Sequence, residues 1–158
     1  MNAPVSIYVH LPWCVSKCPY CDFNSHARPD VLPESEYVAA LLADLECDLD
    51  LAAGRPVSSV FLGGGTPSLF GVDAIAALLK GLATRLPFLP DAEVTMEANP
   101  GTIEHGSFAG YAEAGINRVS LGAQSFNAAS LAVLGRIHGP AEIGVAVAEL
   151  ASAGLHNF

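Results

Sequence analysis

Three cysteines stand close together near the beginning of the chain, in the stretch CVSKCPYCDFNSH. Cys14, Cys18 and Cys21 follow the spacing C-x3-C-x2-C. A thiolate is a nucleophile, a redox group and a soft metal ligand, so three of them at this spacing suit more than one kind of chemistry. The cysteine loop, residues 14–26, therefore predicts either a redox-active dithiol or a metal centre.

The inner part of the loop, CPYC, is the arrangement of a glutaredoxin-like dithiol. Such a site needs its first cysteine at a helix N-terminus, where the helix dipole lowers the pKa of the thiol. The residues after Cys21 contain Pro29 and Pro33 and show no apolar stripe, so no helix is expected there. The dithiol is accordingly the weaker interpretation.

A metal centre uses all three cysteines, and two kinds compete. A structural zinc site takes four ligands, commonly two pairs of cysteines, and here His10 or His26 would have to complete it without the usual second pair. Electron-transfer 4Fe–4S clusters take four cysteines, whereas three thiolates hold three irons and leave the fourth iron open. An incomplete set is useful only if another molecule binds that iron. The missing second pair of ligands makes zinc the weaker of the two candidates.

The composition indicates one packed domain with a strong negative charge. The 158 residues are 51% hydrophobic, and 7 Lys and Arg against 16 Asp and Glu give a formal net charge of −9. Such a surface repels nucleic-acid phosphates and anionic lipids, so neither is an expected partner. The apolar runs are too short for a membrane span, and no secretory signal is visible. We expect a cytoplasmic protein whose clustered cysteines serve metal binding or catalysis rather than disulfides.

Strand-like and helix-like hydrophobic patterns alternate along the chain, which predicts an α/β fold. Asp73 and Asn127 are candidate helix caps, and Cys47 falls on the polar face of the first helix. Strands that alternate with helices form a parallel sheet with right-handed crossovers, and ligands bind at the carboxyl ends of its strands. The expected strands cover residues 5–10, 58–64, 92–99 and 116–122, and the expected helices cover 34–53, 73–86, about 108–115 and the residues from 140 onward.

The remaining motifs each follow one of these strands. GGGTPS, residues 63–68, lacks the lysine of a phosphate-binding loop and the glycine spacing of a dinucleotide site. Glu97 ends the third strand, Gln124 comes just past the fourth, and LGRIHG supplies Arg136 and His138. Each residue alone is as consistent with turn chemistry or a solvated face as with a ligand site. Together they place an acid, an amide and a cation at neighbouring strand ends, which are the groups that a zwitterionic nucleoside ligand requires.

Five segments, taken together, resemble one protein family. They are YVHLPWCVSKCPYCDFNSH, VFLGGGTPSLF, TMEANPGT, NRVSLGAQSF and LGRIHG. The cysteine spacing is similar to the signature of the radical S-adenosylmethionine (SAM) superfamily. The wider match resembles its coproporphyrinogen III dehydrogenase (HemN)-like family and, within it, the heme chaperone (HemW) branch. The resemblance implies a partial (β/α) radical SAM barrel of about four βα units, with residues 1–158 as the N-terminal part of the core domain and the C-terminal domain absent.

The resemblance also implies the cofactors, a 4Fe–4S cluster and SAM. In this superfamily the methionyl amine and carboxylate of SAM chelate the open iron, and an electron from the reduced cluster cleaves the sulfonium to give a radical that abstracts hydrogen. The cofactor carries the chemistry and the protein positions it. The implied cluster ligands are Cys14, Cys18 and Cys21. The implied SAM contacts are Tyr8, Tyr20, Gly64, Gly65, Thr66, Glu97, Gln124 and Arg136.

Heme is a further ligand that the resemblance implies, and three functions compete. Members of the chaperone branch bind heme and deliver it to respiratory enzymes, and an electron donor reduces the cluster. The dehydrogenases decarboxylate coproporphyrinogen III in porphyrin biosynthesis and usually carry a cysteine where this chain has Phe23, which favours the chaperone branch. The third function is a non-catalytic module stabilised by zinc or an iron–sulfur cluster. Heme ligands are expected outside this chain, and His138 and His156 are expected to be structural.

Overall fold

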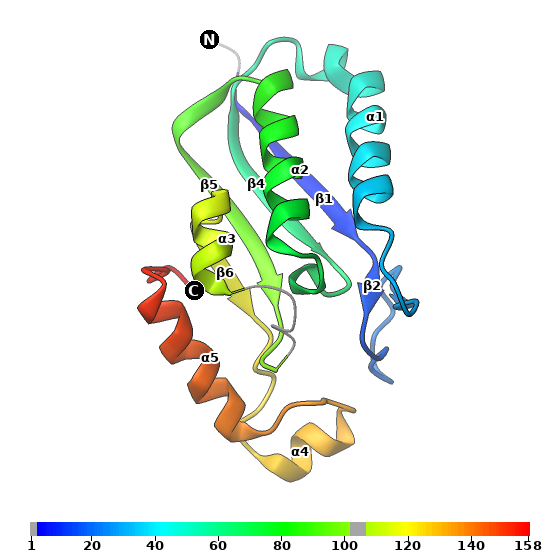
Figure 1. Ribbon diagram of the computed structural model, residues 1–158, viewed down its shortest axis with the longest axis vertical. Coiled ribbons are helices and arrows are strands. Elements are labelled where there is room, and N and C mark those ends of the chain that lie inside the picture. Colours follow the sequence, from blue (N-terminus) through cyan, green and yellow to red (C-terminus); the bar gives the residue numbers. More distant parts are fainter. Residues whose placement is uncertain (1–2, 102–106) are drawn as a thin grey trace.

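A four-stranded parallel sheet forms the centre of the computed structural model, which describes residues 3–101 and 107–158 (Figure 1). The strands lie in the order β1-β4-β5-β6, which is also their order along the chain. The pairings bring Leu11 beside Gly64 and Ala98 beside Leu121. The carboxyl ends of neighbouring strands therefore meet at one edge of the sheet. The strands are β1 (Val5–Leu11), β4 (Val57–Gly64), β5 (Phe88–Ala98) and β6 (Arg118–Leu121).

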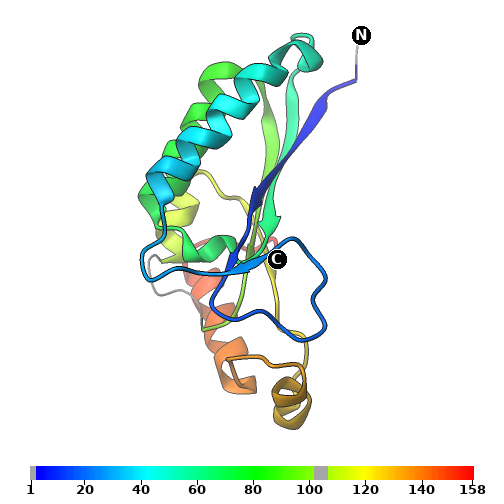
Figure 2. The same cartoon turned by 90° about the vertical axis from the view of Figure 1, so that its right-hand side faces the viewer.

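Helices cover one face of this sheet (Figure 2). When parallel strands follow chain order, right-handed crossovers place every connecting helix on the same side. The first three helices make these connections, a 3-10 turn precedes the second of them, and two more helices follow β6. The bounds are α1 (Glu34–Ala52), η1 (Pro67–Leu69), α2 (Val72–Arg85), α3 (Phe108–Ala114), α4 (Ala128–Val133) and α5 (Pro140–Ser152).

The two faces of the sheet differ in chemistry because successive side chains of a strand point to opposite sides. Buried side chains such as Val9 and Met96 belong to the core that the sheet shares with the helices. The opposite face carries the exposed Tyr8 and an ion pair between Arg118 and Glu93, with 3.3 Å between nitrogen and oxygen. The predicted α/β fold with a parallel sheet is confirmed.

The strands and helices lie close to the expected residues, with one correction at a helix cap. The expected cap Asp73 lies inside the first turn of α2, and Gly71 occupies the N-cap position. The Gly71 amide donates to the Glu34 carboxylate at 3.1 Å, so an acidic side chain of α1 satisfies the end of α2. Asn127 does cap α4, because its side-chain oxygen accepts a hydrogen bond from the Ser130 amide at 3.0 Å.

The last residues of the chain lie beside β6. The Val119 amide of β6 donates to the Asn157 carbonyl at 3.1 Å, so the last residues lie along the edge of the sheet without forming a strand.

Cys47 is exposed on α1, as its place on the polar face predicts. None of the described helices combines the length and the apolar composition that a membrane span requires.

Tyr111 on α3 fixes the segment that follows the glycine-rich turn. Its side chain is fully buried, and its hydroxyl donates to the Phe70 carbonyl at 2.7 Å. Burial raises the pKa of Tyr111 to about 12, and the Glu34 carboxylate contributes a smaller rise. The hydroxyl therefore remains a donor throughout the neutral range of pH, and it joins α3 to the residues at the end of η1.

The substitution Tyr111→Phe is expected to lower the free energy of unfolding by about 1–2 kcal/mol, because it leaves the buried Phe70 carbonyl without this donor. Urea unfolding followed by circular dichroism would show a lower midpoint with an unchanged slope. An unchanged midpoint would mean that the hydroxyl contributes nothing to the packing of α3 against η1.

Candidate metal centre

The cysteine loop closes on itself through a short pairing that the sequence did not predict. β2 (Trp13–Cys14) pairs in parallel with β3 (His26–Ala27). Across the loop, the Lys17 ammonium donates to the Phe23 carbonyl at 3.2 Å. These contacts close the residues between the two short strands into one compact loop, which contains all three cysteines.

No helix follows the CPYC segment before α1 begins at Glu34. The absence of a helix directly after Cys21, which the two prolines predicted, is therefore confirmed. Because a glutaredoxin-like thiol takes its low pKa from a helix N-terminus, the local structure gives no support to the dithiol interpretation.

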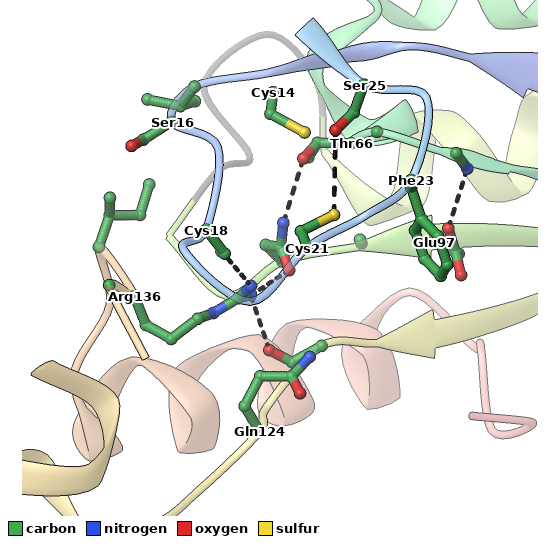
Figure 3. Close-up of a pocket in the computed structure, with 18 of the residues that line it drawn as sticks. Cys14, Ser16, Cys18, Cys21, Phe23, Ser25, Thr66, Glu97, Gln124 and Arg136 are labelled. Atoms are coloured by element: carbon green, nitrogen blue, oxygen red, sulfur yellow. Dashed lines mark hydrogen bonds between the residues drawn. The ribbon is translucent and has the colours of Figure 1, made fainter. Parts of the chain in front are cut away.

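The loop forms part of the wall of a cavity of about 390 Å³ at the carboxyl ends of the strands (Figure 3). This volume lies within the range of small-molecule and cofactor sites. The other lining residues come from the ends of β4, β5 and β6 and from the segment after α4. The lining includes ten of the residues that the sequence singled out: Cys14, Cys18, Cys21, Tyr20, Gly64, Gly65, Thr66, Glu97, Gln124 and Arg136.

Tyr8 lies beside this cavity and is not among its lining residues. Its hydroxyl contacts His10 Nδ1 at 3.0 Å, and His10 Nε2 contacts the Asn24 carbonyl at 2.8 Å. A carbonyl only accepts, so Nε2 carries the proton, and in the neutral ring Tyr8 donates to Nδ1. Burial raises the pKa of Tyr8, and the Glu97 carboxylate raises it further. His10 thus connects β1 to the cysteine loop, with Tyr8 held as a protonated donor.

The glycines of GGGTPS let the chain pack closely against itself. A Cβ on Gly65 would lie 2.6 Å from both the Pro12 carbonyl carbon and the Trp13 oxygen. Gly64 has a φ of +110°, and a Cβ there would lie 2.5 Å from the His10 ring. The family resemblance implies that Gly64 and Gly65 contact SAM. The structure gives a second reason for them, because only glycine allows the turn to contact the peptide that leads into the cysteine loop.

Glu97 brings a half-buried carboxylate to the cavity from the end of β5. Burial raises the pKa of Glu97, and a hydrogen bond from the Gly64 amide, 3.3 Å from Oε2, partly offsets that rise. A carboxylate in such a place accepts hydrogen bonds readily, because the surroundings solvate its charge less well than water does. It is therefore suited to hold the hydroxyl or amino groups of a ligand.

Arg136 brings a positive charge to the cysteine loop from the segment after α4. Its Nη1 donates to the Cys18 sulfur at 3.5 Å, and its Nη2 donates to the Gly122 carbonyl at 3.0 Å and to the side-chain oxygen of Asn99. Burial raises the pKa of the nearby Tyr20 phenol, and Cys18 raises it further, while Arg136 lowers it. The Arg136 Nε is buried and has no acceptor within residues 3–101 and 107–158. That nitrogen could donate to an anionic group of a ligand in the cavity.

Gln124 follows β6 with an unusual backbone conformation. Its φ of 61° lies in the left-handed region, which is uncommon for a residue with a side chain. The buried His138 supports this turn, because its Nε2 lies 3.2 Å from the Ala123 carbonyl and donates to it. The contact agrees with the structural role expected for His138 and presents the Gln124 side chain at the cavity.

Sequence reasoning missed Asn99 and Gly122. The Asn99 Nδ2 donates to the Thr66 hydroxyl at 3.2 Å, so this amide joins the glycine-rich turn to Arg136. A Cβ on Gly122 would lie 2.4 Å from the Asn99 Oδ1, so the glycine leaves the space that the amide occupies. The sequence did contain a signal for these two residues. Asn99 stands two residues after Glu97 at the end of one expected strand, and Gly122 stands at the end of the next expected strand.

The donor set fits a cluster better than a single metal ion. Among the described residues, no three His, Cys, Asp or Glu side chains are close enough to share one ion. A mononuclear zinc site needs four ligands around one centre, whereas the thiolates of a 4Fe–4S cluster bind different irons. Three soft thiolates around one cavity, with the unpaired Nε of Arg136 beside them, suit an iron–sulfur centre that takes an anionic ligand.

Comparison with known proteins identifies the family. The sequence profile of the radical SAM superfamily matches residues 8–158. The chain belongs to the radical SAM superfamily. Membership in this superfamily implies a 4Fe–4S cluster and SAM as cofactors, and it agrees with the C-x3-C-x2-C spacing of the loop.

Several curated relatives of this radical SAM chain are named as heme chaperones. The chain is 53% identical over 155 residues to the heme chaperone HemW of Escherichia coli (strain K12), covering 98% of this chain and 41% of that protein. It is 51% identical to HemW of Haemophilus influenzae, covering 98% of this chain and 42% of that protein. The chain therefore spans about two fifths of the length of these relatives.

A solved structure supports the barrel assignment. The coproporphyrinogen III oxidase HemN of Escherichia coli, described as a radical SAM enzyme, is similar with a TM-score of 0.85 and 30% sequence identity. The similarity covers 97% of this chain and 35% of that chain. The expected partial (β/α) radical SAM barrel is thereby confirmed.

The substitution Gly65→Ala is expected to destabilise the fold by about 1–3 kcal/mol, because its methyl group would overlap the Pro12–Trp13 peptide. The free energy of urea unfolding measures the effect. Gly144→Ala is the matched control: its Cβ would meet nothing within 4 Å, and alanine inside α5 should stabilise the helix by about 0.5–1 kcal/mol. Equal effects of both substitutions would contradict the close approach at Gly65.

The substitution Glu97→Gln is expected to change stability in a way that depends on pH. Because the pKa of Glu97 is higher in the folded chain than in the unfolded chain, ionisation penalises the folded state. The penalty is absent below the ordinary carboxyl pKa and complete above the raised pKa. The variant should therefore be more stable than the wild type at pH 7–8, with the difference disappearing near pH 4. Urea midpoints at several pH values test this, with the exposed Glu113→Gln as a control for the lost charge.

Proposed function

We propose that this chain is part of a radical SAM heme chaperone, a protein that binds heme and delivers it to respiratory enzymes. The observation that carries the proposal is the 53% identity, over 98% of the chain, to a protein named as a heme chaperone. In this proposal residues 1–158 form the N-terminal part of the core domain. The ligands of the heme iron lie in the remaining length that the curated relatives have.

Cys14, Cys18 and Cys21 hold a 4Fe–4S cluster in this proposal and leave one iron open for SAM. The cluster and SAM together supply reductive cleavage of the sulfonium, and the protein supplies binding and orientation. The support for this ligand set is that all three cysteines line one cavity together with polar groups from three strand ends. The proposed SAM-binding residues are Tyr8, Tyr20, Gly64, Gly65, Thr66, Glu97, Gln124 and Arg136.

Each polar side chain of the cavity would bind a different group of a zwitterionic nucleoside. Arg136 has a buried Nε that can donate to a carboxylate. Glu97 accepts hydrogen bonds from amino or hydroxyl groups, and Gln124 can both donate and accept. The half-buried setting of Glu97 and Arg136 strengthens these interactions relative to water.

Coproporphyrinogen III oxidation is the second candidate function, and the fold similarity to HemN favours it. Two observations favour the chaperone. The identity to HemN is 30%, against 53% to HemW. Phe23 is 62% exposed and lines the cavity at the position where the dehydrogenases usually carry a cysteine. A phenyl ring neither binds iron nor transfers a proton, but it offers a flat apolar surface to a porphyrin.

The proposed partners follow from the same assignment. They are heme or a porphyrin, a donor that reduces the cluster, and respiratory proteins that receive heme. The formal net charge of −9 makes nucleic acid an unsuitable partner. We propose the cytoplasm as the location. A zinc- or cluster-stabilised module without catalysis is the alternative from another class, and it differs in that SAM would leave the metal centre unchanged.

Anaerobic reconstitution with iron and sulfide, followed by EPR of the reduced protein, tests the proposed cofactors. The expected result is a 4Fe–4S signal that changes when SAM is added, because SAM binds the open iron. Cys14→Ala should abolish the signal, whereas Cys47→Ala should retain it, since Cys47 is exposed on α1 away from the loop. A protein that binds zinc and assembles no cluster would refute the cofactor assignment.

Heme transfer and porphyrin decarboxylation, measured on the complete gene product, separate the two functions. Heme added to the chaperone should give a Soret band that moves to a heme-free respiratory protein. Coproporphyrinogen III incubated with SAM and a reductant should remain unchanged. Formation of a decarboxylated porphyrinogen would assign the oxidase function instead, and absence of both activities would leave the non-catalytic module.

A further inference from the structure

Three loops of the site meet at the side-chain amide of Asn99. Its Nδ2 donates to the Thr66 hydroxyl at 3.2 Å, and its Oδ1 accepts a hydrogen bond from Arg136 Nη2. Arg136 in turn donates through Nη1 to the Cys18 sulfur at 3.5 Å. The amide thus connects the glycine-rich turn to the segment after α4, and Arg136 continues the connection to the cysteine loop; Figure 3 marks the hydrogen bond between Arg136 and Cys18 with a dashed line.

The orientation of this amide follows from its partners. A guanidinium only donates, so the Asn99 oxygen faces Arg136 and its NH₂ group faces Thr66. Gly122 leaves space for the Asn99 oxygen, since a Cβ there would lie 2.4 Å from it, and the Gly122 carbonyl accepts from the same Arg136 Nη2 at 3.0 Å. Two oxygens from the ends of β5 and β6 therefore hold one edge of the guanidinium, which leaves Nη1 pointing at Cys18.

A guanidinium at the sulfur of a cluster ligand affects the reduction potential of that cluster. Reduction adds negative charge, which a nearby cation and an N–H···S hydrogen bond both stabilise, so the potential becomes less negative. Arg136 and Cys18 are both half-buried, which weakens screening by water. The effect depends on where the flexible arginine side chain is held, and the Asn99 amide and the Gly122 carbonyl hold its Nη2.

We infer that Asn99 is a positioning residue of the metal centre: it aims the Arg136 guanidinium at Cys18 and thereby raises the reduction potential of the cluster. This inference rests on the proposed cluster at Cys14, Cys18 and Cys21. It assigns to that site a residue that acts through a second side chain, since Asn99 accepts from Arg136 Nη2 and Arg136 Nη1 donates to the Cys18 sulfur.

The test is a redox titration of the reconstituted cluster, monitored by EPR in the absence of SAM. Asn99→Leu removes the hydrogen bonds to Thr66 and Arg136 at similar volume, and Arg136→Leu removes the charge. Each variant is expected to retain iron and sulfide and to have a more negative midpoint potential than the wild type. Because Asn99 acts through Arg136, the double variant should have the same midpoint as Arg136→Leu alone. A residue that merely supported the fold would not show this dependence.

A second variant and a control complete the design. Asn99→Ser adds no charge and shortens the side chain so that it no longer reaches Arg136 Nη2; the midpoint should again become more negative, and this variant decides the matter if Asn99→Leu cannot hold a cluster. Asn127→Ser makes the same exchange at the N-cap of α4, where serine can still cap the helix, and should leave the midpoint unchanged. Unchanged midpoints in both Asn99 variants, or additive shifts in the double variant, would overturn the inference. Failure of the wild type to assemble a cluster would instead overturn the proposed function.

Discussion

The contact between the glycine-rich turn and the peptide leading into the cysteine loop is the constraint on which the site depends. Only glycine fits at position 65, where a Cβ would lie 2.6 Å from the Pro12 carbonyl carbon. The Thr66 amide then donates to the Trp13 carbonyl at 2.7 Å, which extends the pairing of β1 and β4 beyond the sheet. Because the loop is fixed to the end of β4, the parallel register of β5 and β6 brings Glu97 and Gly122 to the same cavity.

Much of this arrangement could be predicted from the sequence because hydrophobic period, turn residues and strand order are local signals. The strands, the helices and the convergence of the motifs at strand ends all follow from such signals. The prediction that Asp73 caps α2 was wrong. Gly71 is the N-cap residue, and its amide donates to Glu34, which is distant in sequence. β2 and β3 have only two residues each, which is too short for a hydrophobic period to be detected, so their pairing could not be predicted. The connecting role of Asn99 depends on Thr66 and Arg136, which only folding brings to it, so its place at the end of the expected strand 92–99 did not reveal that role.

The fold and the cavity carry different amounts of functional information. A parallel half-barrel is shared by proteins named as heme chaperones and by a coproporphyrinogen III oxidase, so the fold alone does not select the reaction. In the function that we propose, Phe23 distinguishes this chain from the oxidases, because it is aromatic, exposed and lines the same cavity as the cysteines. The cavity also departs from the acidic character of the whole chain, since Arg136 places a guanidinium against a cysteine sulfur.

The hydrogen bond between Arg136 and Cys18 joins residues that lie 118 positions apart in the chain. At ribosomal rates of about 5–20 residues per second, the cysteines are made on the order of ten seconds before the arginine that contacts them. During that interval the nascent chain carries three clustered thiols, while the strands that complete their cavity are still being synthesised. The finished pocket exists only after the segment following α4 has left the ribosome. In the function that we propose, a cluster is therefore loaded into the complete site only late in the synthesis of the chain, well after the three cysteines have been made.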